Sequence, residues 1–441
     1  MLMGGMVEWE APEASQTPPG ADRAPRRLRW VARVAGVVVL LIVADVAIET
    51  ADRLSETVVF PRQVDPAWVS ATDLGVGPAD SWLGDFASDG HSLYIETREG
   101  IQGFWGSIVV RRSDDGGTTW SPGTTISNPP GPSAARHALA IAPEGTLYAA
   151  WAEQGPQPAT QRLLVRRSVD RGASWSTAVR VSPPKVGLVA LPVFLLGQDM
   201  RLIGYTDGQT GDIWIQRLAI DGSPDGIPTH LGVTNQQLYG DADFIDGGLA
   251  LAQAHGQILA AYVGPGYPAL RVAVSDDGGR SWQSAGSIDQ TFLAGQRPRL
   301  ASDGATIVLA AVDPNESARY VKSPFVRVWR TLDGGASFQR GPDVTDLRSV
   351  GDVDVVWSGG AWRLVYAGCP GFMTCATPSR VWYAVSRDAE HWSRPSVVTE
   401  PGQVRPLGVG AGSFGVSLAW AEVRSDHDWR FVISRRALDA P

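Results

Sequence analysis

The chain has 441 residues, among them 50 glycines, 31 prolines and 17 tryptophans, and 19% of its residues are charged. This abundance of turn residues and tryptophan favours an all-β repeat fold over a helical one. The formal net charge of −8 argues against a nucleic-acid partner, because proteins that bind nucleic acids carry basic patches.

The N-terminal segment has the composition of a disordered tail followed by a membrane anchor. Residues 1–29 show no hydrophobic periodicity and begin with a stretch rich in Pro, Ala, Gly and Glu, so we expect a disordered tail. Residues 30–48 are mostly apolar, and a stretch of about 19 residues is long enough to cross a bilayer as a helix.

Charged residues on either side of this stretch predict its orientation. Arg26, Arg29 and Arg33 lie before it or at its start, while Glu49 and Asp52 follow it. Since basic residues favour the cytoplasmic side, we expect a cytoplasmic N-terminus and an extracytoplasmic main domain. The sequence therefore predicts a single-pass protein of the cell membrane; a cleaved signal peptide is the alternative.

Short turn motifs recur through the rest of the chain. They lie at Ser113–Trp120, Ser168–Trp175, Ser275–Trp282, Thr331–Phe338 and Ser386–Trp392. In such a turn an aspartate accepts backbone N–H bonds, a glycine adopts positive φ, and an aromatic residue begins the next strand. The residues to which we assign these structural roles are Asp114, Gly116, Trp120, Asp170, Gly172, Trp175, Asp276, Gly278, Trp282, Asp333, Asp388 and Trp392.

The spacing of the motifs predicts the architecture. Their aromatic residues recur about every 54 residues, with one interval twice as long, and Ala219–Gly222 is the expected remnant of a decayed copy. A second marker, a strand end followed two residues later by an acid or glycine, ends in seven copies at Glu99, Glu153, Asp207, Gly264, Asp313, Gly368 and Glu422. A period near 50 with four short strands predicts a seven-bladed β-propeller over residues 56–441.

The last repeat is one strand short of a full blade. Three strands are expected after residue 404, and the chain then ends. We predict that Thr57–Val64 supplies the missing outer strand, because ring closure would remove two open sheet edges.

The five motifs resemble the Asp box, or BNR repeat, Ser-x-Asp-x-Gly-x-Thr-Trp, of sialidases and related β-propellers. The resemblance implies a sialidase-like propeller, for which six blades is the alternative count. It also implies an exo-α-sialidase or another glycoside hydrolase acting on acidic sugars, with three arginines that hold a carboxylate, an acid, and a tyrosine nucleophile activated by a glutamate.

Three repeats carry an arginine at the start of the inner strand and an acid at the end of the next strand. The predicted ligand-binding pairs are Arg136 with Glu153, Arg297 with Asp313, and Arg405 with Glu422. These positions are neighbours in an antiparallel pair, so each arginine is expected beside its acid at the mouth of the central funnel. Two interpretations stay open. The pairs are ion pairs that hold strand ends together, or the three arginines form a cluster that binds a carboxylate of a ligand.

The resemblance is incomplete at the catalytic positions. Trp82–Phe86 has no arginine where the family has Arg-Ile-Pro, and Gly100–Gly106 has no aspartate where it has its acid. By position, Glu99 is the candidate acid and Tyr366 the candidate nucleophile. A non-catalytic glycan- or protein-binding propeller, resembling the photosystem II stability factor, is the alternative.

Two further hypotheses concern metals and redox state. Glu99, Glu153, Asp207, Asp313 and Glu422 could form an acidic ring for Ca²⁺; otherwise no metal or cofactor is expected. Cys369 and Cys375 lie in one short loop, so an extracytoplasmic location predicts a disulfide between them, with two free thiols as the alternative.

Overall fold

The computed structural model describes residues 63–438, except for segments 75–83, 103–104, 128–132, 155–160, 184–188, 235–247, 266–269, 289–295, 314–324, 343, 345–348, 370–378, 403 and 426–427. The predicted tail, the predicted anchor and Cys375 lie outside the described residues. Within them, no helix is long and apolar enough to cross a membrane.

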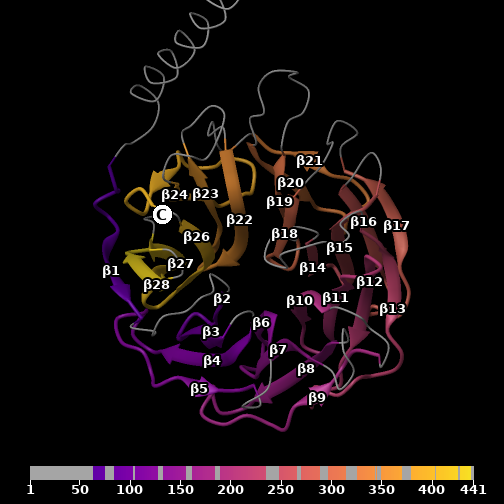
Figure 1. The fold of residues 1–441 in the computed structure, drawn as a ribbon. Coiled ribbons are helices and arrows are strands. Elements are labelled where there is room, and N and C mark those ends of the chain that lie inside the picture. Colours follow the sequence, from indigo (N-terminus) through magenta and orange to yellow (C-terminus); the bar gives the residue numbers. More distant parts are fainter. Residues whose placement is uncertain are drawn as a thin grey trace, which may run out of the picture. The chain divides into compact units, whose positions relative to one another are not determined.

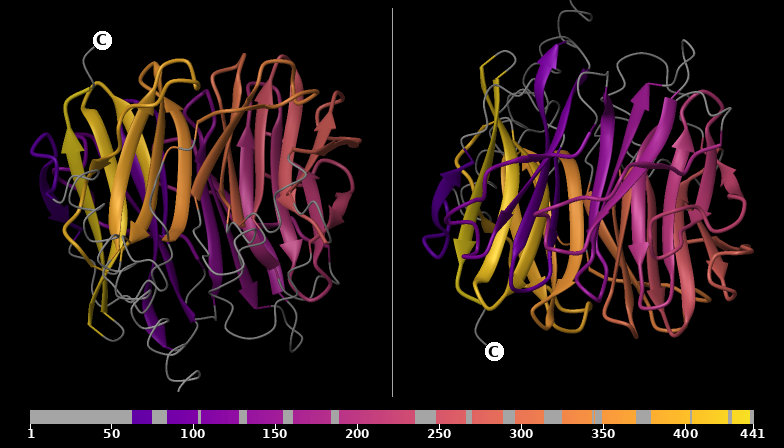
Figure 2. Two further views of the ribbon diagram at one scale, coloured as in Figure 1. Left: turned by 90° about the horizontal axis from the view of Figure 1, so that it is seen from above. Right: turned by 90° about the horizontal axis from the view of Figure 1, so that it is seen from below.

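The described strands form seven four-stranded sheets arranged around a centre, as Figure 1 shows. This confirms the predicted all-β, seven-bladed propeller, so the six-bladed alternative is wrong. Figure 2 shows the blades from the side, with their strands running between the two faces of the ring. We letter the strands of each blade a to d from the inside outwards.

The blades take their strands in chain order. Blade 1 has β2 (Gly84–Ser88), β3 (Leu93–Gln102), β4 (Trp105–Ser113) and β5 (Thr124–Thr125); blade 2 has β6 (Ser133–Ile141), β7 (Leu147–Gln154), β8 (Gln161–Ser168) and β9 (Val179–Arg180). Blade 3 has β10 (Val189–Leu196), β11 (Arg201–Asp207), β12 (Asp212–Arg217) and β13 (Thr229–Val233); blade 4 has β14 (Leu249–Ala254), β15 (Gln257–Val263), β16 (Leu270–Ser275) and β17 (Gln283–Ser287). Blade 5 has β18 (Gln296–Ser302), β19 (Ile307–Asp313), β20 (Phe325–Thr331) and β21 (Gln339–Arg340); blade 6 has β22 (Ser349–Ser358), β23 (Ala361–Cys369), β24 (Arg380–Ser386) and β25 (Ser396–Val397). Blade 7 has β26 (Val404–Gly412), β27 (Gly415–Ser425) and β28 (Asp428–Arg436), and its d strand is β1 (Val69–Asp73).

An N-terminal strand closes the ring, but not at the predicted residues. β1 (Val69–Asp73) pairs antiparallel with β28, whereas Gln63 and Val64 precede that strand and residues 57–62 lie outside the described part. Trp68 explains the position. Its ring meets Tyr383 edge-on at 5.3 Å and lies under the Arg436 guanidinium at 5.4 Å. Trp68 therefore takes the place of a motif aromatic, and the d strand follows it.

The core lies between neighbouring blades. Blades 5 and 6, for example, share a cluster that contains Val328, Tyr366 and Trp382. Tyr366 is fully buried there and stacks on Trp382 at 6.5 Å. Burying one such aromatic side chain stabilises the fold by about 2–3 kcal/mol.

The turns between strands c and d share one hydrogen-bond pattern. In blade 1, Asp115 Oδ1 accepts from the backbone N–H groups of Thr118 and Thr119, both at 2.9 Å, and Ser113 Oγ accepts from Gly117 N–H at 2.7 Å. Asp170, Asp277 and Asp333 accept backbone and hydroxyl hydrogens in the same way. Hydrogen bonds from Ser174 lower the pKa of Asp170 to about 2.

Two motif assignments shift by one residue. Asp115 and Asp277, not Asp114 and Asp276, hold the turns of blades 1 and 4. Asp114 instead forms an ion pair with Arg171 of the next blade. Gly116 and Gly278 have positive φ, but the glycines that donate to the turn serines are Gly117 and Gly279. Consecutive aspartates and glycines made the register ambiguous in the sequence.

Candidate functional site

Acidic residues near the ends of three b strands pair with arginines of the c strands. Glu99 pairs with Arg111 in blade 1, Glu153 with Arg162 at 3.3 Å in blade 2, and Glu422 with Arg430 at 2.8 Å in blade 7. We call these the strand-end pairs. They lie toward the face opposite the c–d turns. Each b strand runs antiparallel to its c strand, so it ends at the face where the c strand begins. Each arginine is held by a carboxylate of its own blade.

A second set of ion pairs joins the inner strands of three consecutive blades. On β22, Asp352 and Asp354 are two residues apart and share one side of the strand. Arg405 of β26 approaches Asp352, with 3.1 Å from Nε to Oδ2, and Arg299 of β18 approaches Asp354, with 3.9 Å from Nε to Oδ1. Arginines from blades 5 and 7 thus converge on the inner strand of blade 6. We call these the inner-strand pairs.

Both inner-strand pairs are partly exposed. The side chains of Arg299 and Asp354 are 37% and 24% exposed, and those of Arg405 and Asp352 are 20% and 15% exposed. Partial burial raises the pKa of Asp354 to about 6, and the charge of Arg299 only partly offsets this shift. The arginines are therefore oriented by carboxylates at a partly open position.

A third group is buried between blades 1 and 2. Asp85 lies opposite Glu96 in the β2–β3 register, and Glu96 Oε2 is 3.1 Å from His137 Nδ1 of β6. Asp85 Oδ2 also accepts from Leu139 N–H at 2.7 Å. Burial raises the pKa of Asp85 to about 7 and that of Glu96 well above its usual value. Glu96 and His137 are enclosed, so this group joins two blades rather than meeting a ligand.

The structure pairs the predicted site residues differently. Glu153 and Glu422 pair with Arg162 and Arg430, which lie directly opposite them in register, and Arg405 pairs with Asp352 of the neighbouring blade. Irregularities in the a–b register, at Ser133/His137, Gln296/Arg299 and Pro406/Gly408, explain the difference. Arg136, Arg297 and Asp313 lie on β6, β18 and β19, but their side chains lie outside the described residues. The predicted convergence of three arginines stays a prediction.

The predicted catalytic residues are not placed for catalysis. Tyr366 is 0% exposed between two blades, so its assignment as a nucleophile is wrong. The Glu99 side chain is 20% exposed, but one of its carboxylate oxygens accepts from Thr97 Oγ1 at 2.5 Å and both face Arg111. The Glu99 carboxylate is therefore already hydrogen-bonded to donors of the protein.

The acidic ring does not present a cluster of free oxygens. Glu99, Glu153 and Glu422 are in ion pairs, and Asp207 accepts from Gln209 N–H at 2.9 Å. Among the described residues, the one group spaced for a metal is Asp388, Glu390 and His391 on the other face.

Cys369 ends β23, and its predicted disulfide with Cys375 stays a prediction.

Sequence reasoning missed both carboxylates of β22 and the c-strand arginines. The signal for the former was an Asp-x-Asp alternation inside an otherwise apolar inner strand, Asp352-Val353-Asp354. The signal for the latter was an arginine in strand c of each blade that carries a strand-end acid. No sequence pattern groups Asp85, Glu96 and His137, because they occupy unrelated positions in two repeats.

No protein-family model matches the chain, and no curated protein matches it. A PL25 ulvan lyase bound to a GlcA–Rha3S saccharide is similar in structure, with a TM-score of 0.53 and 12% identity over 84% of this chain and 96% of the lyase. YCF48 bound to a D1 peptide has a TM-score of 0.50 and 15% identity, over 86% of this chain and 99% of YCF48. The phage phi92 endosialidase has a TM-score of 0.48 and 9% identity, over 84% of this chain and 69% of the endosialidase. The likenesses to the lyase and to YCF48 concern the fold alone and leave the function open.

Proposed function

We propose that this propeller binds an acidic glycan on the face opposite the c–d turns, without hydrolysing it. The observation that carries the proposal is the convergence of Arg299 and Arg405, from two different blades, on the same inner strand. A planar guanidinium binds a carboxylate through two parallel hydrogen bonds and stays charged at all relevant pH values.

The aspartates hold the guanidinium groups of these arginines in place. Asp352 contacts Arg405 at Nε, at 3.1 Å. An anionic sugar at the channel mouth would meet guanidinium groups that are already fixed, so little side-chain entropy is lost on binding. The strand-end pairs would add oriented arginines around the same face.

The exo-α-sialidase alternative needs an acid and a tyrosine nucleophile that both reach the substrate. The burial of Tyr366 and the engagement of Glu99 by Arg111 and Thr97 argue against it. The hydrogen bonds of the c–d turns support the Asp-box resemblance, which concerns the fold. A protein ligand in place of a glycan is the remaining alternative.

We further propose that the propeller faces the outside of the cell and is held at the membrane by residues 30–48. The apolar character of that stretch and the arginines before it support this location. Accessibility of the propeller to protease added to intact cells would test it; complete protection in intact cells, lost on lysis, would contradict it.

The test of function combines an array of acidic and neutral glycans with a fluorogenic sialoside. We expect binding to carboxylated or sulfated glycans, no binding to neutral ones, and no turnover. Arg405→Gln should weaken binding about tenfold, as expected for the loss of a charge-assisted hydrogen bond. Arg340→Gln on the outer strand β21 is the matched control and should leave glycan binding unchanged. Turnover would favour the hydrolase, and failure to bind every acidic glycan would contradict the proposal.

A further inference from the structure

Each c–d turn packs on the blade before it, and an arginine from that blade usually caps it. The donor is an arginine at the last or next-to-last residue of strand c. The acceptor is a backbone carbonyl oxygen in the c–d turn of the following blade. The bonds run from Arg112 to Arg171 (3.4 Å), Arg167 to Ile220 (3.3 Å), Arg217 to Gly278, Arg330 to Asp388 (3.2 Å) and Arg435 to Asp115 (3.3 Å). The turn therefore fills the same space at junction after junction.

At the junction between blades 6 and 7, no c–d turn of the described residues fills that space. The d strand of blade 7 is β1 (Val69–Asp73), so β28 is not joined to its d strand by a c–d turn. In blade 6 the capping position is Val385, since it precedes the turn residue Ser386 as Arg330 precedes Thr331. Arg363 of strand b lies opposite Val385.

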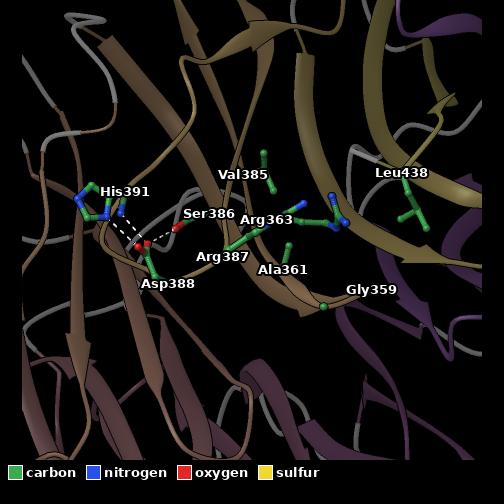
Figure 3. Close-up of a pocket in the computed structure, with 10 residues that line it drawn as sticks. Gly359, Ala361, Arg363, Val385, Ser386, Arg387, Asp388, His391 and Leu438 are labelled. Atoms are coloured by element: carbon green, nitrogen blue, oxygen red, sulfur yellow. Dashed lines mark hydrogen bonds and ion pairs between the residues drawn. The ribbon is translucent and has the colours of Figure 1, made fainter. Parts of the chain in front are cut away.

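A cavity of about 550 Å³ lies at this position. Its walls include Ala361, Val385 and Arg387 of blade 6 and Leu438 beyond the end of β28. Figure 3 shows Arg363 and Arg387 extending into the space between Val385 and Leu438. We call this cavity the closure pocket. Its volume is in the range of pockets for small molecules.

The pocket presents positive charge from two directions. Arg363 is 1% exposed, and its guanidinium is fixed by donation from Nε to Ser358 O at 3.1 Å and from Nη1 to Tyr383 Oη. Arg387 is exposed on the turn that forms the opposite wall. The one carboxylate in the lining, Asp388, is turned to its own loop, where it accepts from His391 Nδ1 at 2.7 Å and His391 N–H at 2.8 Å. The same hydrogen bond raises the pKa of His391.

We propose that the closure pocket is a binding site for a small anion that carries a carboxylate or phosphate group. The anion takes the place of the missing turn. Its oxygens accept hydrogen bonds at the wall that Arg387 and Arg363 form, as turn carbonyls accept hydrogen bonds from arginines at the other junctions. This site is on the face opposite to the proposed glycan site and does not depend on it.

The test titrates inorganic phosphate, and separately citrate, into the full chain by calorimetry at constant ionic strength. We expect one site, and a loss of affinity of about tenfold in Arg387→Gln, which removes a charge-assisted donor at an exposed position. Leu438→Glu places a carboxylate at the pocket and should weaken binding at least as much. Leu438 is 45% exposed, so this change should not unfold the protein.

Leu332→Glu is the matched control. Leu332 is 54% exposed on the c–d turn of blade 5, and the change alters net charge by the same amount. The control should bind phosphate and citrate like the unaltered chain. Two results would overturn the proposal: no binding of either anion, or equal losses in Leu332→Glu and Leu438→Glu, which would show a general charge effect.

Discussion

On the turn face, an aspartate accepts the same hydrogen bonds in blades 1, 2, 4 and 5, and arginines cap the turns at five junctions. On the opposite face the charged partners change from blade to blade. Blades 1, 2 and 7 pair an acid with an arginine of strand c, whereas blade 6 offers Asp352 and Asp354 to arginines of its neighbours.

The difference follows from the range of the contacts. A c–d turn closes its hydrogen bonds within a few residues, as Asp115 does with Thr118 and Thr119, so the same short sequence serves blades 1, 2, 4 and 5. An inner-strand pair joins residues of different repeats, such as Arg299 and Asp354, and needs no repetition. Changes on the turn face should therefore act on stability, and changes on the opposite face on binding.

The largest expected effect is on the turn face. Asp115→Ala removes the acceptor of two backbone N–H groups and of the Thr119 hydroxyl. We expect the free energy of unfolding to fall by about 2–3 kcal/mol, measured by urea titration, because these donors lose their partner. Asp114→Ala is the control. Asp114 accepts from the Ser92 hydroxyl at 2.6 Å and pairs with the partly exposed Arg112 and Arg171, so a smaller loss of about 1 kcal/mol is expected. Equal losses in the two variants would contradict the assignment of Asp115.

The buried acids between blades 1 and 2 predict a pH-dependent stability. The pKa of Asp85 is about 7 in the folded chain, against 3.8 ordinarily, so the folded state keeps a proton that the unfolded state releases between these values. The free energy of unfolding should therefore fall as the pH rises from 5 to 8, by about 2–3 kcal/mol from Asp85, and the raised pKa of Glu96 acts in the same direction.

Asp85→Asn separates this effect from other titrating groups. The amide cannot accept both Leu139 N–H and Phe86 N–H, so it should cost about 1 kcal/mol at pH 5. Urea midpoints at pH 5, 6, 7 and 8 should nevertheless show a shallower slope than in the unaltered chain. An unchanged slope would mean that Asp85 does not carry the effect.

The repeated turns made the fold predictable from the sequence. The motif at Ser113–Trp120 and its copies gave the blade count, and the short last repeat gave the closure of the ring. The closing strand was placed too early because Thr57–Val64 has strand character. The motif period counted back from Trp120 falls near Trp68, whose packing on Tyr383 fixes where the strand begins.

The candidate site was predictable only in its residue types. Arg405, Glu153 and Glu422 do lie in charged pairs, but with other partners than the repeat position implied. Register irregularities in the inner strands, such as that between Pro406 and Gly408, change which blade an arginine meets. Such shifts depend on the packing of whole blades, so neither spacing nor residue type reveals them.

A smaller effect is expected on the opposite face, and it should appear in binding alone. Asp352→Asn keeps the shape of the side chain but removes the charge that orients Arg405. We expect affinity for an acidic glycan to fall about threefold to fivefold, with a change in unfolding free energy below about 1 kcal/mol, since the pair is partly exposed. Arg405→Gln and the double variant should then bind alike. Additive losses would show that Asp352 acts independently of Arg405.

The smallest expected effect is a pH dependence of the same binding. The pKa of Asp354 is raised to about 6, so this carboxylate is charged at pH 7 and mostly neutral at pH 5. Protonation removes a negative charge beside Arg299. A ligand carboxylate with a pKa near 3–4 stays ionised over this range. Affinity should thus rise about twofold to threefold from pH 7 to pH 5 at constant salt. Asp354→Asn should remove the rise, and a variant that keeps it would assign the titration to another group.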